Sequence, residues 1–225
     1  MTRPAVPRVI VIPDPRFAAG ASIESLALAA LAGGADAIQL RAKGLPRVDI
    51  EVLGRRLAAA CRAHGARFFV NDDAAAALAC GADGVHVGPG DSAPAQAREV
   101  LGTRGLIGVS VYTDADLAAA HAARADYVAV GAVYPTQTKA IDVVGLDGVR
   151  RLRAKTRLPI IAIGGVDATN AGAAIAAGAD GVAVISAVCG ASDPEAATRA
   201  LCGRVRQALA VCSVRDQGQE SRSPA

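Results

Sequence analysis

The chain has 225 residues, a length that suits one large α/β domain, because barrels and doubly wound folds commonly run to about 200 to 250 residues. Apolar residues make up 52% of it but aromatic residues only 3%, so the core must be built from Ala, Val, Ile and Leu. Its 24 basic residues are interleaved with 21 acidic ones, and the net charge of +3 forms no stripe that would neutralise a nucleic-acid backbone. We therefore expect no nucleic-acid partner, whereas small anionic ligands remain compatible with this charge.

The cysteines and the apolar runs indicate where the protein works. Five cysteines without a CxxC pair favour neither a zinc site nor a disulfide framework, so a reducing cytoplasm fits best. No apolar run reaches about 18 residues, and the N-terminus enters "RVIVIPDP" without a signal-peptide pattern. We expect a cytoplasmic protein with no membrane partner, and the sequence leaves open whether it forms a homo-oligomer.

Four repeated segments organise the chain. Each places Ala-Asp directly before a β-rich run, with the acids at Asp36, Asp83, Asp126 and Asp180. Their spacings of 47, 43 and 54 residues suit two βα units each. Further apolar runs lie before and between these segments, so that eight strands are expected within 8–13, 33–40, 66–72, 80–87, 105–111, 123–130, 159–165 and 177–184.

A helical stretch follows each expected strand. Plausible N-caps stand near several of the helix starts, at Ser22, Asp73, Asp114, Asn170 and Asp193. Eight βα units in one domain predict an α/β fold of the single-domain (βα)8 TIM-barrel type over residues 1–211, with an open doubly wound sheet as the less favoured arrangement. The last helix should end near Val211, and we interpret the polar segment 212–225 as a disordered C-terminal tail.

In such a barrel, the loops that leave the strands at their C-terminal ends carry the chemistry. The four Ala-Asp acids lie on the entering side and are interpreted as structural caps or turns. On the leaving side of the second strand, "IQLRAKG" gives Gln39 and Arg41 the same parity, with Lys43 in the loop. A buried Gln needs hydrogen-bond partners and an inward Arg needs an anion, so both fit a ligand at the barrel mouth. The alternative is a satisfied core Gln beside a solvated loop.

Two carboxylates follow the third and fourth strands. Asp72 is the third residue of "VNDD" (70–73) and Asp91 ends "VHVGPGD", and neighbouring strands bring such groups to one rim. Two hard oxygen ligands without a His or Cys cluster suit Mg²⁺ shared with substrate phosphates better than zinc. Ordinary helix capping is the alternative for both.

The remaining strand exits offer hydroxyls and glycines. Ser110 ends the fifth strand, while Gly164, Gly165, Ile185 and Ser186 follow the seventh and eighth, where many barrels bind phosphate. A glycine pair there permits close approach by a ligand or simply forms a turn. His86 lies within the fourth strand and is interpreted as a packed, hydrogen-bonded residue, whereas His64 and His121 are expected on the surface.

After the sixth strand comes "VYPTQTKAIDVVGL" (133–146), which sets two threonines, a glutamine and a lysine within four residues. Together with "IQLRAKG", "FFVNDDAAAALACGADGVHVG", Asp91, "IGVSVYT", "IAIGGV" and "GADGVAVISA", this segment resembles the thiamine phosphate synthase family in order and spacing. The resemblance covers about residues 9 to 190. It implies a (βα)8 barrel that joins hydroxymethylpyrimidine diphosphate to hydroxyethylthiazole phosphate, releasing pyrophosphate and forming thiamine phosphate.

The resemblance also implies roles for individual residues. Contacts to the pyrimidine diphosphate would come from Gln39, Leu40, Arg41, Ala42, Lys43, Asn71, Ser110 and Lys139. The thiazole phosphate would be held by Thr136, Gln137, Thr138, Gly165, Ile185 and Ser186. Asp72 and Asp91 would bind Mg²⁺, and catalysis would rest on Arg41, Lys43, Lys139 and Ser110.

Two other functions remain open at this point. A related thiazole tautomerase shares the fold but relies on a His after the fifth strand, where this chain has Tyr112. A noncatalytic sensor of thiazole phosphate is the other alternative, because Pro13, Ala42, Pro89 and Gly90 depart from the usual synthase residues.

Overall fold

The computed structural model describes residues 6–18, 20–88, 93–136 and 142–220, with side chains through Cys212. Eight parallel strands close into a barrel in which each strand pairs with its neighbours in chain order and β8 pairs with β1. The expected (βα)8 barrel is therefore confirmed. The strands are β1 (Val9–Val11), β2 (Ala37–Leu40), β3 (Arg67–Asn71), β4 (Gly84–Val87), β5 (Leu106–Ser110), β6 (Tyr127–Val130), β7 (Ile160–Ile163) and β8 (Gly181–Val184).

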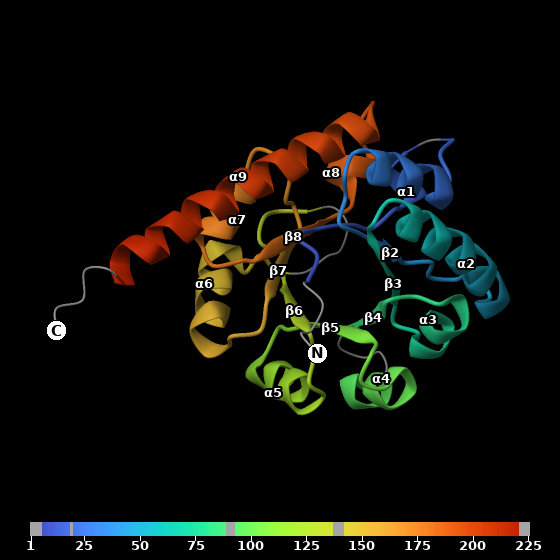
Figure 1. Cartoon of the computed structure of the whole chain (residues 1–225), viewed down its shortest axis with the longest axis horizontal. Helices are drawn as coiled ribbons and strands as arrows, with labels where there is room; N and C mark the ends of the chain where they lie inside the picture. Colours follow the sequence, from blue (N-terminus) through green and yellow to red (C-terminus); the bar gives the residue numbers. More distant parts are fainter. Residues whose placement is uncertain (1–5, 19, 89–92, 137–141, 221–225) are drawn as a thin grey trace.

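The helices surround this barrel, and the long α9 begins beside α1 and α8 and runs past α7 (Figure 1). No helix among the described residues is both long enough and apolar enough to cross a bilayer. The helices are η1 (Pro15–Phe17), α1 (Ile23–Ala32), α2 (Arg47–Ala63), α3 (Ala74–Cys80), α4 (Pro94–Leu101), α5 (Asp114–Ala122), α6 (Gly145–Lys155), α7 (Ala171–Ala176), α8 (Ser186–Cys189) and α9 (Pro194–Glu220).

Alternation along the strands divides the core in two. One set of side chains packs between the sheet and the helices, and it includes Ile38, Leu40 and Val128. The other set fills the barrel interior and includes Ile10, Phe69, Leu106, Tyr127 and Ile161. Side chains of opposite parity on one strand point to opposite faces, so every strand except β4 contributes to both sets.

The four repeated acids join neighbouring strands on the entering side of the barrel. The Oδ2 atom of each accepts a backbone N–H from the preceding strand, at 2.8 to 2.9 Å. The structural interpretation of these acids is confirmed, although they act as links between strands rather than as helix caps. The pairs are Asp36 with Val9, Asp83 with Phe68, Asp126 with Ile107, and Asp180 with Ile160.

The expected helix caps are confirmed at three of five positions. Ser22, Asp73 and Asp193 accept a hydrogen bond from the backbone N–H three residues on. At α5 the cap is Thr113 instead of Asp114, since Thr113 and Asp116 form a reciprocal capping box. Asn170 stands at the N-cap position of α7 without a side-chain capping bond, because its amide oxygen accepts from Asp167 instead.

The end of the last helix differs from the expectation. Helix α9 continues to Glu220 instead of ending near Val211. The segment after Val211 contains no proline before Pro224, and residues such as Val214, Arg215 and Gln217 are ordinary helix formers that need no apolar face to continue a helix. Lack of periodicity was therefore a poor guide to where this helix stops. The division into a 1–211 domain and a disordered tail stays a prediction.

Candidate active site

A cavity opens at the C-terminal ends of the strands, on the side expected to carry the chemistry. Its walls come from all eight strand exits, and its floor is the apolar interior at Ile10 and Ala129. The structure thus brings together residues that are spread over most of the chain. The predicted site residues that line it are Gln39, Arg41, Lys43, Asn71, Asp72, Ser110, Thr136, Gly165, Ile185 and Ser186.

Gln39 and Arg41 reach the cavity from β2 and the loop after it. The Gln39 side chain is only 3% exposed, yet within the described part of the chain its amide makes no hydrogen bond to another residue. Arg41 likewise forms no ion pair with any described carboxylate. No fully buried side-chain polar atom of the described residues lacks a hydrogen-bond partner, so the Gln39 amide is open to the cavity that it lines. An amide and a guanidinium that offer hydrogen bonds to one cavity favour a bound ligand over a satisfied core Gln.

Asp72 follows β3 with its backbone in the left-handed region, at φ 68°. Asp tolerates this conformation better than most residues, and here it also allows the Asp72 N–H to donate to the His86 carbonyl oxygen at 2.8 Å. The Lys43 Nζ lies 3.6 Å from the Asp72 Oδ2. A carboxylate and an ammonium group from neighbouring strand exits therefore meet at the cavity. Capping is not the role of Asp72, since Asp73 caps α3.

The loops after β6 and β7 are held against each other. Val133 and Tyr134 donate backbone hydrogen bonds to Ile163 and Gly164 at 3.0 and 2.9 Å. Gly165 has φ 66°, and a Cβ at this position would lie 2.5 Å from the Pro135 carbonyl oxygen. The glycine is thus required by the neighbouring loop and by the turn. Gly165 affects the cavity indirectly, because it lets the 132–136 segment come close to the β7 exit.

A side-chain network supports the same loops. The Tyr134 hydroxyl donates to the Asn170 carbonyl oxygen at 3.1 Å, and the Asn170 amide donates to the Gly165 carbonyl oxygen at 2.9 Å. Burial raises the pKa of Tyr134, which keeps its hydroxyl protonated and able to donate. The position of the glycine turn therefore depends on residues that do not themselves line the cavity.

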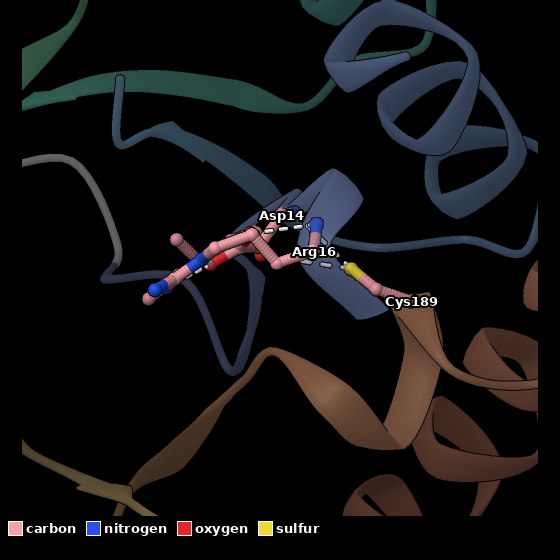
Figure 2. A network of polar contacts seen from close by, with 4 residues as sticks. Asp14, Arg16 and Cys189 are labelled. Carbon is pink, nitrogen blue, oxygen red and sulfur yellow. Dashed lines mark hydrogen bonds and ion pairs between the residues drawn. The ribbon is translucent and has the colours of Figure 1, made fainter. Parts of the chain in front are cut away.

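A hydrogen bond connects the segment that follows β1 with the helix that follows β8 (Figure 2). The Asp14 N–H donates to the Cys189 Sγ at 3.4 Å, which links the β1 exit to α8, the helix that begins at Ser186. The Asp14 carboxylate accepts from the Arg16 guanidinium, with an Nη2 to Oδ2 distance of 2.5 Å. The hydrogen bond from Arg16 holds the pKa of Asp14 below its usual value despite partial burial.

Two cavity residues with polar side chains were not among the predicted site residues. His86 lines the cavity from β4, and Tyr112 does so from the loop after β5. The expectation that His86 is packed and hydrogen-bonded is confirmed, since it is 8% exposed and bonds Tyr127 and Ser110. His86 has the same strand parity as Gly84, so its side chain points into the barrel, and it pairs with Asn71 on the neighbouring strand. This parity was the signal that could have placed His86 at the site as well. His64 and His121 are exposed, as expected.

Some predicted site residues are not brought to the cavity. Leu40 is 1% exposed and packs between the sheet and the helices, and Ala42 packs against the same core, so neither side chain lines the cavity. The parity of the strand that turns Gln39 inward turns Leu40 outward. Asp91, Gln137, Thr138 and Lys139 lie outside the described residues, as do Pro89 and Gly90.

A closed (βα)8 barrel with a polar, cation-bearing cavity at the strand exits defines a TIM-barrel enzyme. The chain belongs to the thiamine monophosphate synthase family, whose model matches residues 9–188. The resemblance found in the sequence is confirmed, and with it the assignment to transferases of thiamine biosynthesis.

Individual relatives agree over most of the chain. The thiamine-phosphate synthase of Moorella thermoacetica is 45% identical over 193 residues, covering 85% of this chain and 92% of the relative. That of Geobacillus kaustophilus is 48% identical over 185 residues, covering 80% and 83%. Among solved structures, the thiamine phosphate pyrophosphorylase from Pyrococcus furiosus superposes with a TM-score of 0.81 at 38% identity, covering 90% of this chain and 96% of that one. These relatives carry the synthase name, so the tautomerase and sensor alternatives are not favoured.

Proposed function

We propose that this protein joins hydroxymethylpyrimidine diphosphate to hydroxyethylthiazole phosphate in the cytoplasm, forming thiamine phosphate and pyrophosphate. The observation that carries the proposal is the cavity, which the Gln39 amide, the Arg41 guanidinium and the Lys43–Asp72 pair line together in a chain of the synthase family. Five free thiols, four of them buried, agree with a reducing compartment. The partners are small phosphorylated molecules.

The proposed reaction needs little acid–base chemistry from the protein. The thiazole nitrogen forms a bond to the pyrimidine methylene carbon while the bond from that carbon to the pyrophosphate oxygen breaks. The attacking nitrogen carries no proton, so no general base is required. An electron-rich aminopyrimidine can stabilise positive charge on the methylene, which favours a dissociative path through a carbocation. The barrier is therefore governed by negative charge that builds on the departing pyrophosphate.

Cationic side chains at the mouth suit this task. Arg41 and Lys43 are in place at the cavity, and Lys139 would join them from the segment after Thr136. Fixed cations aimed at developing charge lower a barrier more than they strengthen substrate binding. By analogy with oxyanion-hole donors, removing one such contact should cost about 3 to 4 kcal/mol in transition-state stabilisation. Gln39, Asn71 and Ser110 would orient the pyrimidine diphosphate among these cations.

The donor set at the rim fits a magnesium ion. Asp72 presents a carboxylate beside the Asn71 amide, and oxygen donors of this kind suit Mg²⁺. Asp72 and Asp91 would hold the ion, which would supply further neutralisation of pyrophosphate charge. Lys43, now 3.6 Å from the Asp72 carboxylate, would then be available to the diphosphate.

The other side of the cavity would hold the thiazole phosphate. Gly165 lies at the exit of β7, opposite β3 in the barrel order, and Ile185 and Ser186 follow β8. With Thr136, Gln137 and Thr138 they would form a phosphate site from backbone N–H groups and hydroxyls. The segment 133–146 would then lie between the substrates, with its threonines toward one phosphate and Lys139 toward the departing pyrophosphate.

Purified protein mixed with both phosphorylated substrates and Mg²⁺ should form thiamine phosphate, measured by chromatography. Asp72→Asn and Lys139→Ala should each lower kcat/KM by about 10²-fold or more, because each removes one charge from the pyrophosphate end of the site. Circular dichroism should show the fold unchanged in both variants.

Matched controls come from exposed charges on the helices. Asp147→Asn and Lys155→Ala, on α6, should leave kcat/KM unchanged. Folded wild-type protein that forms no thiamine phosphate would refute the synthase proposal. Wild-type rates in both Asp72→Asn and Lys139→Ala would instead refute the site assignment.

A further inference from the structure

Three side chains form a hydrogen-bonded chain from the barrel core to the cavity. The Tyr127 Oη lies 3.1 Å from the His86 Nδ1, and the His86 Nε2 lies 3.0 Å from the Ser110 Oγ. Tyr127 is 1% exposed and does not line the cavity, whereas His86 and Ser110 do. The chain therefore connects a fully buried phenol with a hydroxyl at the substrate end of the barrel.

Packing holds the two rings of this chain in one arrangement. The His86 and Tyr127 rings are stacked, with centroids 5.6 Å apart and planes at 29°, and Phe69 packs edge-on against Tyr127 at 5.8 Å. Gly108 provides the space: a Cβ there would lie 2.1 Å from the Tyr127 Cζ and 2.5 Å from the His86 Nδ1. The glycine of β5 thus lets residues of β4 and β6 meet across it.

The buried phenol sets the direction of the hydrogen bonds. Burial raises the pKa of Tyr127, so its hydroxyl keeps a proton that must be donated. Within the described part of the chain, the acceptor in reach is the His86 Nδ1. The opposite tautomer, protonated at Nδ1, would leave the phenol proton buried without an acceptor. That arrangement is unfavourable, because a buried donor left unsatisfied loses its hydration without compensation.

The consequence appears at Ser110. If Nδ1 accepts from Tyr127, the proton of the neutral imidazole is on Nε2 and is donated to the Ser110 Oγ. The single hydroxyl proton of Ser110 must then point away from His86. The direction left open to it is the cavity that Ser110 lines.

We propose that Tyr127 and His86 are positioning residues that hold the Ser110 hydroxyl as a hydrogen-bond donor directed into the cavity, toward the anionic group of the substrate. That this anion is the diphosphate of the pyrimidine substrate rests on the proposed function. The orientation of Ser110 itself rests on the hydrogen-bond chain alone. A donor that is oriented before the substrate arrives needs no reorganisation when charge develops.

The tautomer of His86 can be measured without any turnover. The protein has three histidines, so ¹⁵N NMR of labelled protein at pH 8 resolves them, and His86→Gln identifies the signals of His86. We expect a neutral ring protonated on Nε2 in the wild type, and loss of that preference in Tyr127→Phe. A neutral ring protonated on Nδ1, or a ring that is cationic at pH 8, would overturn the proposal.

A double-mutant cycle tests whether Tyr127 acts through Ser110. Tyr127→Phe should lower kcat/KM about fivefold, the usual effect of one neutral hydrogen bond. In the Ser110→Ala background the same substitution should change kcat/KM by less than about twofold, because no hydroxyl remains to be oriented. Equal losses in the two backgrounds would show that Tyr127 only supports the fold, and the proposal would fail.

Tyr134→Phe is the matched control for this cycle. It also removes one phenol hydroxyl, but its partner is the Asn170 carbonyl oxygen at the start of α7, not a residue of the His86–Ser110 chain. Its effect should be the same with and without the Ser110 hydroxyl. If the wild type forms no thiamine phosphate while His86 is protonated on Nε2, the synthase proposal fails and the orientation of Ser110 stands.

Discussion

At the scale of single residues, the polar side chains in and beside the cavity differ in how many hydrogen bonds and ion pairs they make to other residues. Gln39 and Arg41 make no side-chain hydrogen bond or ion pair to a described residue, while Asp14, one strand away, is held by Arg16. Arg41 acts on Asp14 only through its charge, which lowers the pKa of Asp14 together with Arg16. The contrast therefore separates side chains whose hydrogen-bonding groups are open to a ligand from those held by other residues. This contrast depends on tertiary contacts, so the sequence alone does not reveal it.

The Asp14–Arg16 pair makes a contribution to stability that depends on pH. The pKa of Asp14 is lower in the folded protein than its ordinary value of 3.8, so the folded state favours the ionised carboxylate. The stabilisation is therefore fully present above about pH 4 to 5 and is lost as the pH falls through the folded pKa. Asp14→Asn should lower the urea midpoint relative to wild type at pH 7, and the difference should shrink toward pH 3.

Arg16→Gln provides the control, since it breaks the same pair and leaves the carboxylate in place. Its loss should also be larger at pH 7 than at pH 3. A difference between wild type and Asp14→Asn that is constant over this range would contradict the assignment. We expect the effect to be small, because Arg16 is mostly exposed to solvent.

At the scale of elements, the repeated Ala-Asp unit is a device that joins pairs of strands. Each acid precedes an even-numbered strand and accepts an N–H from the odd-numbered strand before it. Three of the four acids also pair with an arginine at 2.9 Å. The repeat thus strengthens the bottom of the barrel and leaves the strand exits free to vary.

Burial should decide how much each link contributes. The Asp126 and Arg98 side chains are only 6% and 17% exposed, while those of Asp180 and Arg153 are 50% and 31% exposed. Asp126→Ala should lower the free energy of unfolding by about 3 kcal/mol, because it leaves a mostly buried guanidinium without its counter-charge. Asp180→Ala should cost about 1 kcal/mol. Equal losses in urea denaturation would show that burial does not control these links.

At the scale of the whole molecule, the last helix packs on the first. Helix α9 meets the end of α1 at Gly33, and the Cys202 Sγ donates to the Gly34 carbonyl oxygen at 3.2 Å. Leu201 and Val205 of the same helix are buried. The two ends of the barrel sequence are therefore fastened together outside the β1–β8 pairing (Figure 1).

Two glycine substitutions test this closure in opposite directions. A Cβ at Gly33 would lie 2.5 Å from the Glu195 carbonyl oxygen, so Gly33→Ala should push α9 away and lower the free energy of unfolding by about 1 to 3 kcal/mol. Gly203, within α9, has no atom within 4 Å of its Cβ position apart from its chain neighbours and its own helix backbone, and Gly203→Ala should stabilise by about 0.5 to 1 kcal/mol. Thermal unfolding measures both, and stabilisation by Gly33→Ala would contradict the contact.

The fold could be read from the chain because its signals are local and repeated. Alternating apolar runs, their spacing and the Ala-Asp units all depend on neighbouring residues, so they predicted the eight strands and the barrel. Strand parity likewise predicted that Gln39 and Arg41 point to the cavity together. The end of α9 was missed, because a helix can continue on backbone propensity after its apolar pattern has stopped.

Other features depended on contacts between segments that are distant in the sequence. His86 and Tyr127 are 41 residues apart, yet their hydrogen bond sets the proposed direction of the Ser110 hydroxyl. The sequence left open whether Gly165 contacts a ligand or forms a turn. In the structure a glycine is required there, because a Cβ would collide with the carbonyl oxygen of Pro135. Periodicity determines which face of the sheet a side chain occupies, but its partners there are determined by strand register and barrel closure, which bring residues from all eight strands to one cavity.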